Sequence, residues 1–248
     1  MISARTFREL YRELAPSRDR GSLVVGGARA HAPALRRELG VEGADDPRGA
    51  AVYVHVWAGD GSDEALLRRA RRARVPIVAL APEDVDEVPW VAATCVVPLR
   101  AGQGFPVEAI AKAVAARLGD DAAPLAARVP VLRRAVARQV IEGAARKNGL
   151  VAAAVFVPGV DMPILLRNEL RMVARLEQVY GRQLASGNRL PELAGTFAVG
   201  LGLREVAREL LDLIPVAGWA VKGAVAYAGT RALGRAALAR LEALPRGH

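Results

Sequence analysis

The sequence has one cysteine, Cys95, and only three histidines among its 248 residues. A single cysteine cannot form a disulfide within the chain, so we expect a reducing compartment. The histidines form no HExxH arrangement, and neither a CxxC pair nor a Gly-x-Ser-x-Gly elbow occurs. The sequence therefore contains no complete set of catalytic groups. We expect a protein that is not an enzyme, with no catalytic residues, no metal and no cofactor.

Aromatic residues are also scarce, at 4% of the chain. Proteins that bind single-stranded nucleic acid stack bases on aromatic side chains, so this scarcity argues against that function. Five arginines between positions 68 and 74 offer contacts for a phosphate backbone. Such a run on one helix is more often a solvated face, and we expect no nucleic-acid partner.

Long uninterrupted apolar runs are missing too. A membrane-spanning helix needs about 20 predominantly apolar residues without a charge near the centre. Asp161 interrupts the first candidate, Arg204 bounds the second, and Asp212 and Lys222 interrupt the third. We expect a soluble or peripheral helical bundle, and a hairpin around residues 158–159 that inserts into the bilayer is the alternative.

Positive charge is concentrated in one half of the chain. Residues 1–128 carry 18 Lys and Arg against 17 Asp and Glu, whereas residues 129–248 carry 17 against 9. A basic region with apolar helices suits the anionic cytoplasmic face of a membrane, or an acidic protein partner.

Residues 21–120 alternate short apolar runs with helical patterns. The pattern predicts four strands, at 22–25, 51–57, 75–80 and 94–97, with a closing helix at 105–118. Strands that alternate with helices favour a parallel sheet covered on both faces, a small doubly wound α/β domain. Residues 1–20 are rich in charge and predict a short amphipathic helix rather than a secretory signal.

The loop after the first strand is the natural place to look for a phosphate site, because such sheets bind ligands at the carboxyl ends of their strands. A P-loop has two glycines five positions apart, followed by Lys and by Ser or Thr. Counted from Gly26, the position of the second glycine holds His31, that of the lysine Ala32 and that of the Ser or Thr Pro33. The groups that would carry charge and bind magnesium are therefore missing. The residues left as a degenerate phosphate loop are Gly26, Gly27, Arg29 and His31.

The order of these elements, the Val25-Gly26 entry to the loop and the segment from Val96 to Phe105 resemble an Era-type small GTPase domain, over roughly residues 20–118. In that family the third strand here would lead into an Asn-Lys-x-Asp motif, which the segment Ala79–Asp84 does not contain. The segment Trp57–Asp60 has Gly and Asp in the opposite order from the Asp-x-x-Gly magnesium loop. The resemblance thus implies a GTPase fold that has lost GTP binding and hydrolysis.

The second half of the chain predicts a helical domain. One amphipathic helix covers residues 129–147 and is expected to end at Asn148-Gly149, and a second covers residues 164–184. From Leu190 onward the chain is rich in glycine and alanine. Glycine inside a helix costs about 0.5 to 1 kcal/mol relative to alanine, so repeated use indicates closely packed helices. Small residues at steps of four, at positions 226, 230 and 234, fit such packing.

Several motifs in this half belong together: Pro158-Gly159-x-Asp161, Tyr180-Gly181, Arg204-Glu205 with Arg208, Ile214-Pro215-x-x-Gly218, and Ala226 to Gly234. From Asn148 to about Leu241 they resemble the bacterial YcjF-type domain of unknown function, which often follows an Era-type GTPase domain. The resemblance implies a GTPase-linked protein at the inner membrane or its surface.

We expect interaction or structural roles for a set of residues in these motifs: Asp161, Arg204, Arg208, Pro215, Gly218, Lys222, Gly229, Thr230 and Gly234. Asp161 and Lys222 interrupt apolar segments, which suggests a buried ion pair. Capping of a helix by Asp161 is the alternative.

The predicted architecture is α/β plus all-α: an N-terminal helix at 1–20, a degenerate GTPase-like domain at 21–120 and a basic helical domain at 129–243. The expected function is that of a non-catalytic pseudo-GTPase, an interaction or scaffold protein in the cytoplasm, peripheral to the inner membrane. Its expected partners are an active GTPase or a second copy of the chain, together with an anionic membrane surface. The alternatives are a nucleotide-binding switch or weak NTPase with an atypical P-loop, and an integral membrane protein with inserted glycine-rich helices.

Overall fold

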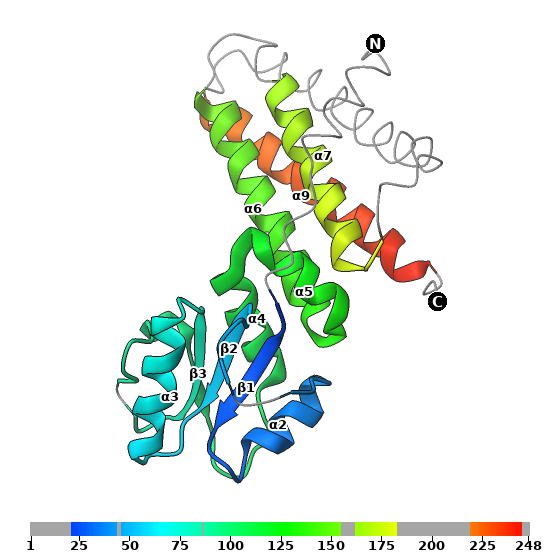
Figure 1. The fold of residues 1–248 in the computed structure, drawn as a ribbon. Helices are drawn as coiled ribbons and strands as arrows, with labels where there is room; N and C mark the ends of the chain where they lie inside the picture. The colour runs from blue at the N-terminus through cyan, green and yellow to red at the C-terminus, as the bar shows by residue number, and fades with distance from the viewer. Residues whose placement is uncertain (1–20, 44–45, 86, 155–161, 183–218, 245–248) are drawn as a thin grey trace. The chain divides into compact units, whose positions relative to one another are not determined.

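The computed structural model describes residues 21–43, 46–85, 87–154, 162–182 and 219–244 (Figure 1). The chain divides into two compact units, one of residues 17–139 and one that includes residues 140–248. We call them the α/β unit and the helical unit, and describe each by itself. The N-terminal helix predicted for residues 1–20 lies outside the described residues.

The α/β unit is built on four parallel strands that pair in the order β1-β2-β3-β4. They are β1 (Leu23–Gly27), β2 (Val52–Val56), β3 (Ile77–Pro82) and β4 (Val96–Leu99). All five residues of β2 are buried, as expected for a central strand of a parallel sheet with both faces covered. A parallel sheet followed by a helical region confirms the predicted α/β plus all-α class.

The strand order does not reverse anywhere among the strands that the structure describes. Open α/β sheets bind their ligands in the crevice where the order reverses, because connections on either side of that point leave toward opposite faces. These four strands contain no such point.

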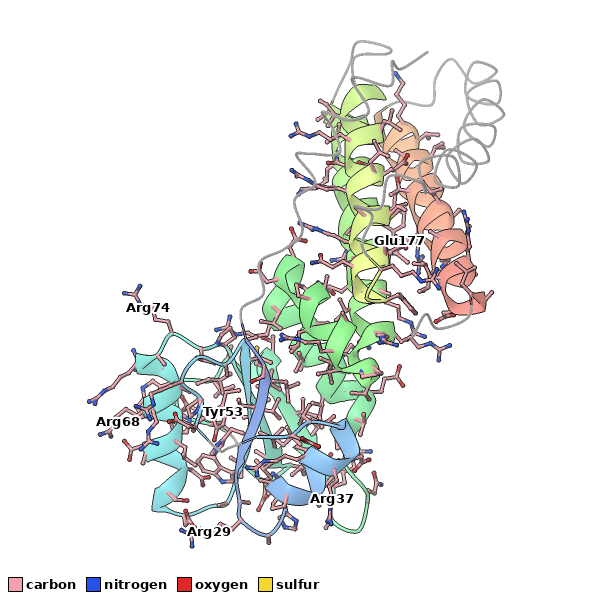
Figure 2. All side chains as sticks on the ribbon, turned by 45° about the vertical axis from the view of Figure 1, so that its right-hand side comes forward. Arg29, Arg37, Tyr53, Arg68, Arg74 and Glu177 are labelled. Carbon is pink, nitrogen blue, oxygen red and sulfur yellow. The ribbon has the colours of Figure 1, made fainter. Side chains whose placement is uncertain are left out.

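Four α-helices accompany the sheet: α2 (Ala32–Leu39), α3 (Gly61–Arg72), α4 (Val107–Leu118) and α5 (Ala122–Arg128). The α3 helix covers one face, where its Leu67 and Ala70 share a buried cluster with Tyr53 of β2 and Ile77 of β3. Tyr53 lies in the layer between the sheet and α3 (Figure 2). A capping box opens α3, since the Asp60 carboxylate accepts a hydrogen bond from the Ser62 amide and Asp63 reaches back to the Asp60 amide.

The described helices of the helical unit are α7 (Met162–Val179), α9 (Trp219–Ala243) and the part of α6 (Arg133–Ala154) that begins at Val140. The glycines of α6 and α9 explain how closely these helices approach. A Cβ atom placed on Gly149 would lie 3.1 Å from the carbonyl oxygen of Gly223, and one on Gly223 would lie 2.9 Å from the oxygen of Gly149. The backbones of α6 and α9 therefore meet where both helices have a glycine. This is the close packing that the glycine content predicted.

The predicted end of the first helix at Asn148-Gly149 is wrong, because α6 continues to Ala154. Gly149 lies inside the helix and serves the contact with Gly223 rather than a left-handed cap. The second helix ends earlier than predicted, at Val179 instead of Leu184. The reason is Gly181, whose φ of +72° ends the helix in the left-handed conformation that glycine adopts easily.

Candidate functional site

The glycines at the end of β1, predicted as part of a degenerate phosphate loop, are both required by packing. A Cβ atom on Gly26 would lie 2.6 Å from the hydroxyl oxygen of Tyr53. Gly27 has a φ of +104°, and a Cβ atom there would lie 2.0 Å from the carbonyl oxygen of Val56. The neighbouring strand thus needs glycine at both positions, whether or not a ligand approaches the loop.

The amide groups of this loop also have partners within the protein. The amide of Ala28 donates to the carbonyl oxygen of Val56 at 2.8 Å. The amides of His31 and Ala32 both donate to the carbonyl oxygen of Ala28, at 3.0 and 2.8 Å. Pro33, at the start of α2, has no amide hydrogen to offer. Ala28, His31, Ala32 and Pro33 therefore offer a phosphate no free amide.

The two polar side chains predicted for this loop, Arg29 and His31, are exposed. Arg29 lies at the end of the sheet (Figure 2), close enough to Asp60 for its charge to contribute to the lowered pKa of that carboxyl group. The main cause of this shift is the hydrogen bonding from Ser62. The structure therefore places Arg29 beside an acidic side chain.

A buried polar chain lies at the end of β2, next to the same loop. The Nε2 atom of His55 is 2.9 Å from a carboxylate oxygen of Asp63, and its Nδ1 atom is 3.2 Å from the hydroxyl oxygen of Tyr53. Since the carboxylate accepts, Nε2 carries the proton and Nδ1 accepts from the tyrosine. All three side chains are buried.

Asp63 is held further by backbone groups, because its carboxylate accepts from the amides of Ala58, Gly59 and Asp60 at 2.8 to 3.2 Å. Burial lowers the pKa of His55, and the carboxylate of Asp63 only partly opposes that shift. A neutral, fully hydrogen-bonded imidazole below the surface fastens β2 to the start of α3. These contacts give His55 a structural role.

A second buried polar cluster joins three helices of the helical unit. The side-chain amide of Asn148 on α6 donates to the hydroxyl of Thr230 on α9 at 2.9 Å. The Thr230 hydroxyl donates in turn to a carboxylate oxygen of Glu169 on α7 at 3.0 Å. The side-chain amide of Asn168 donates to the side-chain oxygen Oδ1 of Asn148 at 2.8 Å. Asn148, Thr230 and Glu169 are buried, so these bonds fix the register of α6, α7 and α9.

A half-exposed cluster flanks this site. The Tyr227 hydroxyl of α9 donates to the Glu142 carboxylate of α6 at 2.7 Å, and Arg146 and Arg231 lie 3.2 and 3.7 Å from the same carboxylate. The hydrogen bond from Tyr227, followed by the charges of the two arginines, lowers the pKa of Glu142. Glu142 therefore stays ionised and connects α6 with α9.

The interaction residues predicted for this half are found in different settings. Thr230 lies in the buried cluster, and Gly234 packs where a Cβ atom would lie 2.8 Å from Ile141 side-chain carbons and 3.0 Å from the Met172 sulfur. Gly229 and Lys222 are exposed. The remaining predicted residues lie outside the described residues: Asp161, Arg204, Arg208, Pro215 and Gly218. Because Asp161 is among them, the predicted ion pair between Asp161 and Lys222 lies outside the described residues too.

The sequence interpretation missed Asn148, Glu169, Glu142 and Tyr227 as partners across helices. Their signal was the presence of polar residues on otherwise apolar helix faces. Within the described residues, no three or more His, Cys, Asp or Glu side chains are grouped as metal ligands would be. None of the described helices has an apolar stretch that is long enough to cross a bilayer.

The fold and these sites define a two-part protein: an α/β unit whose strand-end glycines serve packing, and a helical unit held together by buried polar side chains. The family model described as "Domain of unknown function (DUF697)" matches residues 122–247, slightly more than half of the chain. The chain belongs to this family, and the resemblance of its second half to a domain of unknown function is confirmed. Neither a curated protein nor a solved structure matches the chain.

Proposed function

We propose that this protein is a non-catalytic pseudo-GTPase, an interaction or scaffold protein at the cytoplasmic membrane surface. In this proposal the α/β unit descends from a small GTPase domain and no longer binds nucleotide. The helical unit supplies the contact surface. An active GTPase or a second copy of the chain is the proposed protein partner.

The observation that carries the proposal is the use of the strand-end loop by the protein itself. Phosphate binding at such a loop depends on free backbone amides and on glycines that allow a phosphate to come close. Here the amides of Ala28, His31 and Ala32 already donate to backbone oxygens, and Gly26 and Gly27 accommodate Tyr53 and Val56. The loop is therefore better explained as a packed turn than as a nucleotide site.

Isothermal titration of the full chain with GTP, GDP and ATP in the presence of Mg²⁺ tests this proposal. We expect no saturable heat at micromolar protein concentration, while an active small GTPase titrated in the same buffer gives a binding isotherm with GTP and GDP. Micromolar binding at the strand-end loop would contradict the proposal and favour the nucleotide-binding switch.

Support for a membrane contact comes from the end of the helical unit where α6 finishes and where α7 and α9 begin. Leu150, Ile164 and Val221 are exposed there by 72%, 45% and 37% of their surfaces. Lys147 and Lys222 are exposed on the same stretches of α6 and α9. Apolar side chains next to lysines are the combination that binds an anionic lipid surface.

Vesicle flotation tests the membrane contact. We expect the full chain to float with vesicles of phosphatidylglycerol and phosphatidylcholine, and not with phosphatidylcholine alone. Lys222→Gln should weaken flotation several-fold, since each lysine near an anionic surface contributes about 1 kcal/mol. Leu150→Asn should also weaken it several-fold, since it removes an apolar side chain from the contact. Arg235→Gln is the matched control, because Arg235 is exposed farther along α9. Equal losses in Lys222→Gln and Arg235→Gln would argue against a defined contact.

Extraction of membranes with carbonate separates the peripheral protein from the integral alternative. A peripheral protein is released, whereas resistance to extraction would favour inserted helices. Light scattering of the full chain at two concentrations tests self-association, and the appearance of a dimer would make a second copy the first partner to consider.

A further inference from the structure

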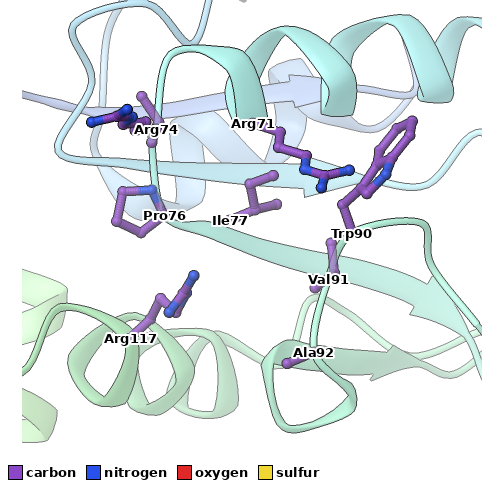
Figure 3. Close-up of a pocket in the computed structure, with 9 residues that line it drawn as sticks. Arg71, Arg74, Pro76, Ile77, Trp90, Val91, Ala92 and Arg117 are labelled. Carbon is purple, nitrogen blue, oxygen red and sulfur yellow. The ribbon is translucent and has the colours of Figure 1, made fainter.

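A basic pocket lies at the opposite end of the sheet from the strand-end loop. It has a volume of about 350 Å³ and lies where α3 and α4 end and β3 begins. Three arginines line it: Arg71 and Arg74 at the end of α3 and Arg117 near the end of α4. Figure 3 shows Arg71 and Arg117 on either side of Ile77, with Arg74 and Trp90 at opposite ends of the pocket.

The pocket combines this charge with an apolar floor. Residues 75–77 and 91–92 supply valine, proline, isoleucine and alanine side chains, and no acidic residue lines it. In the part of the chain that the structure describes, no ion pair neutralises Arg71, Arg74 or Arg117. Arg71 instead lies over the ring of Trp90, with its guanidinium carbon 5.7 Å from the ring centre. A volume of this size suits a small organic molecule.

Backbone conformation sets two lining residues apart. Arg74 and Trp90, with φ of 56° and 61°, are the non-glycine residues with positive φ among those described. Both line this pocket. Residues in this conformation are uncommon, and they collect at sites where the side chain has a role besides packing.

At both positions the backbone conformation is one in which glycine is the usual residue. The amide of Arg74 bonds to the oxygen of Arg71 and the amide of Val75 to the oxygen of Ala70, which is the Schellman pattern with Arg74 at the left-handed position. Trp90 follows Pro89 in a turn closed by the bond from the Val91 amide to the Val88 oxygen. Proline first and positive φ second define a type II turn, in which glycine is preferred.

The ends of α3 and α4 raise the question of whether these arginines only balance helix dipoles. A helix carboxyl end carries about half a negative charge, so two ends contribute about one. Three guanidinium groups exceed that amount by about two positive charges. The excess matches a dianion, and guanidinium groups bind the oxygens of phosphate in pairs.

We propose that this pocket binds a phosphate monoester carried on an apolar body. The guanidinium groups of Arg74 and Arg117 bind the phosphate, Arg71 stays over the ring of Trp90 and adds its charge to the site, and the floor around Ile77 holds the apolar part. The ligand is either a soluble phosphate monoester or the headgroup of a lipid such as phosphatidic acid, which offer the same phosphate chemistry.

Calorimetry of the full chain tests the proposal with three probes: inorganic phosphate, phenyl phosphate, and vesicles of phosphatidic acid in phosphatidylcholine. We expect saturable binding of one phenyl phosphate per chain, tighter than that of inorganic phosphate. Binding to the vesicles without binding to phenyl phosphate would assign the pocket to a lipid headgroup. Absence of saturable binding of both phenyl phosphate and the vesicles would overturn the proposal.

Arg74→Gly is the most informative variant, since it removes a guanidinium and also relieves the backbone. We expect binding to weaken by about tenfold or more, the effect of losing one charge-assisted hydrogen bond, while the thermal midpoint is at least that of the wild type. Arg117→Gln should weaken binding to a similar extent. Arg72→Gln is the matched control, because Arg72 is exposed on α3 and does not line the pocket.

An equal loss in Arg72→Gln would overturn the proposal, since attraction by overall charge would then explain the binding. The same variants keep this site apart from the strand-end loop. Heat from GTP that disappears in Arg74→Gly belongs to the pocket, whereas heat that persists in Arg74→Gly contradicts the pseudo-GTPase proposal instead.

Discussion

The α/β unit and the helical unit both bury polar side chains, but their partners lie at different distances along the chain. In the α/β unit His55 bonds to Asp63, eight positions away. In the helical unit Asn148 bonds to Thr230, 82 positions away. The first contact forms when one strand meets the next helix, whereas the second requires α6 to meet α9, with the whole of α7 between them in the sequence. Glycine differs in the same way: at Gly27 it allows a local backbone conformation, and at Gly149 it allows a distant helix to approach.

The largest expected effect is the loss of stability of the α/β unit when Gly27 is replaced, while the helical unit keeps its stability. Gly27→Ala introduces a Cβ atom 2.0 Å from the Val56 oxygen at a φ of +104°, so we expect a loss of more than about 4 kcal/mol in the free energy of unfolding of the α/β unit. Hydrogen exchange measured by mass spectrometry should show lost protection in residues 21–118 and retained protection in α7 and α9.

Gly40→Ala is the matched control for this substitution. Gly40 also has a positive φ, of +65°, but nothing lies within 4 Å of its added Cβ atom. We expect a loss of about 1 kcal/mol from the backbone conformation alone. Equal losses at the two positions would mean that the contact with Val56 contributes nothing.

The second prediction concerns the buried acid of the α/β unit. Asp63→Ala leaves the His55 ring and three backbone amides without their acceptor, and we expect a loss of about 3 to 5 kcal/mol. Chemical denaturation followed by circular dichroism measures it. Glu64→Gln, one residue along α3 and exposed, should change stability little; a comparable loss there would assign the effect to the charge of the first helical turn.

A pair of glycines tests the close packing of the helical unit. Gly234→Ala places a methyl group 2.8 Å from Ile141 side-chain carbons, and we expect a loss of about 1 to 3 kcal/mol. Gly229→Ala adds the same methyl group in open space on the same helix and should stabilise by about 0.5 to 1 kcal/mol. Thermal denaturation of both variants measures the difference, and changes of the same sign would contradict the packing described for α9.

The smallest expected effect is a difference in pH dependence. The pKa of His55 is lowered in the folded protein, so the unfolded chain binds more protons and the α/β unit loses stability as the pH falls below the ordinary histidine value of about 6.5. One such group contributes at most about 1.4 kcal/mol per pH unit.

The helical unit has its own pH window, because the described part of it contains no histidine. The pKa of Glu142 is lowered, so its contribution is present above the ordinary carboxyl range and is lost as the pH falls through that range. Hydrogen exchange from pH 7 to 5 should therefore show weakening in β2 and α3 before α9. Weakening in α9 first would reverse the assignment.

The predictability of the fold follows the same division. The apolar runs that became β1 to β4 are continuous and bounded by turn residues, so the sequence placed each strand within a few residues. The predicted end of α6 was wrong because a glycine after asparagine is typical of a helix end. Only the close approach of Gly223 explains why Gly149 lies inside the helix. Asn148 and Glu169 were missed for the same reason, since their partners are set by helix packing rather than by neighbours in the sequence.

The basic pocket shows a different limit. The sequence displays the arginines of α3 as a run on one helix, which is commonly a solvated face. Arg117 and Trp90 come from other segments, and the positive φ of Trp90 follows from the turn at Pro89. Only the assembled unit brings them together around Ile77.

The uninterrupted strand order also bears on how the protein is made. Each described strand after β1 pairs with the strand synthesised just before it. A ribosome that releases the chain at about 5 to 20 residues per second therefore delivers every pairing partner in sequence, and no strand waits for a later one to be inserted beside it. The sheet can grow by addition at one edge as it emerges, and β4 completes it before most of the helical unit has been translated.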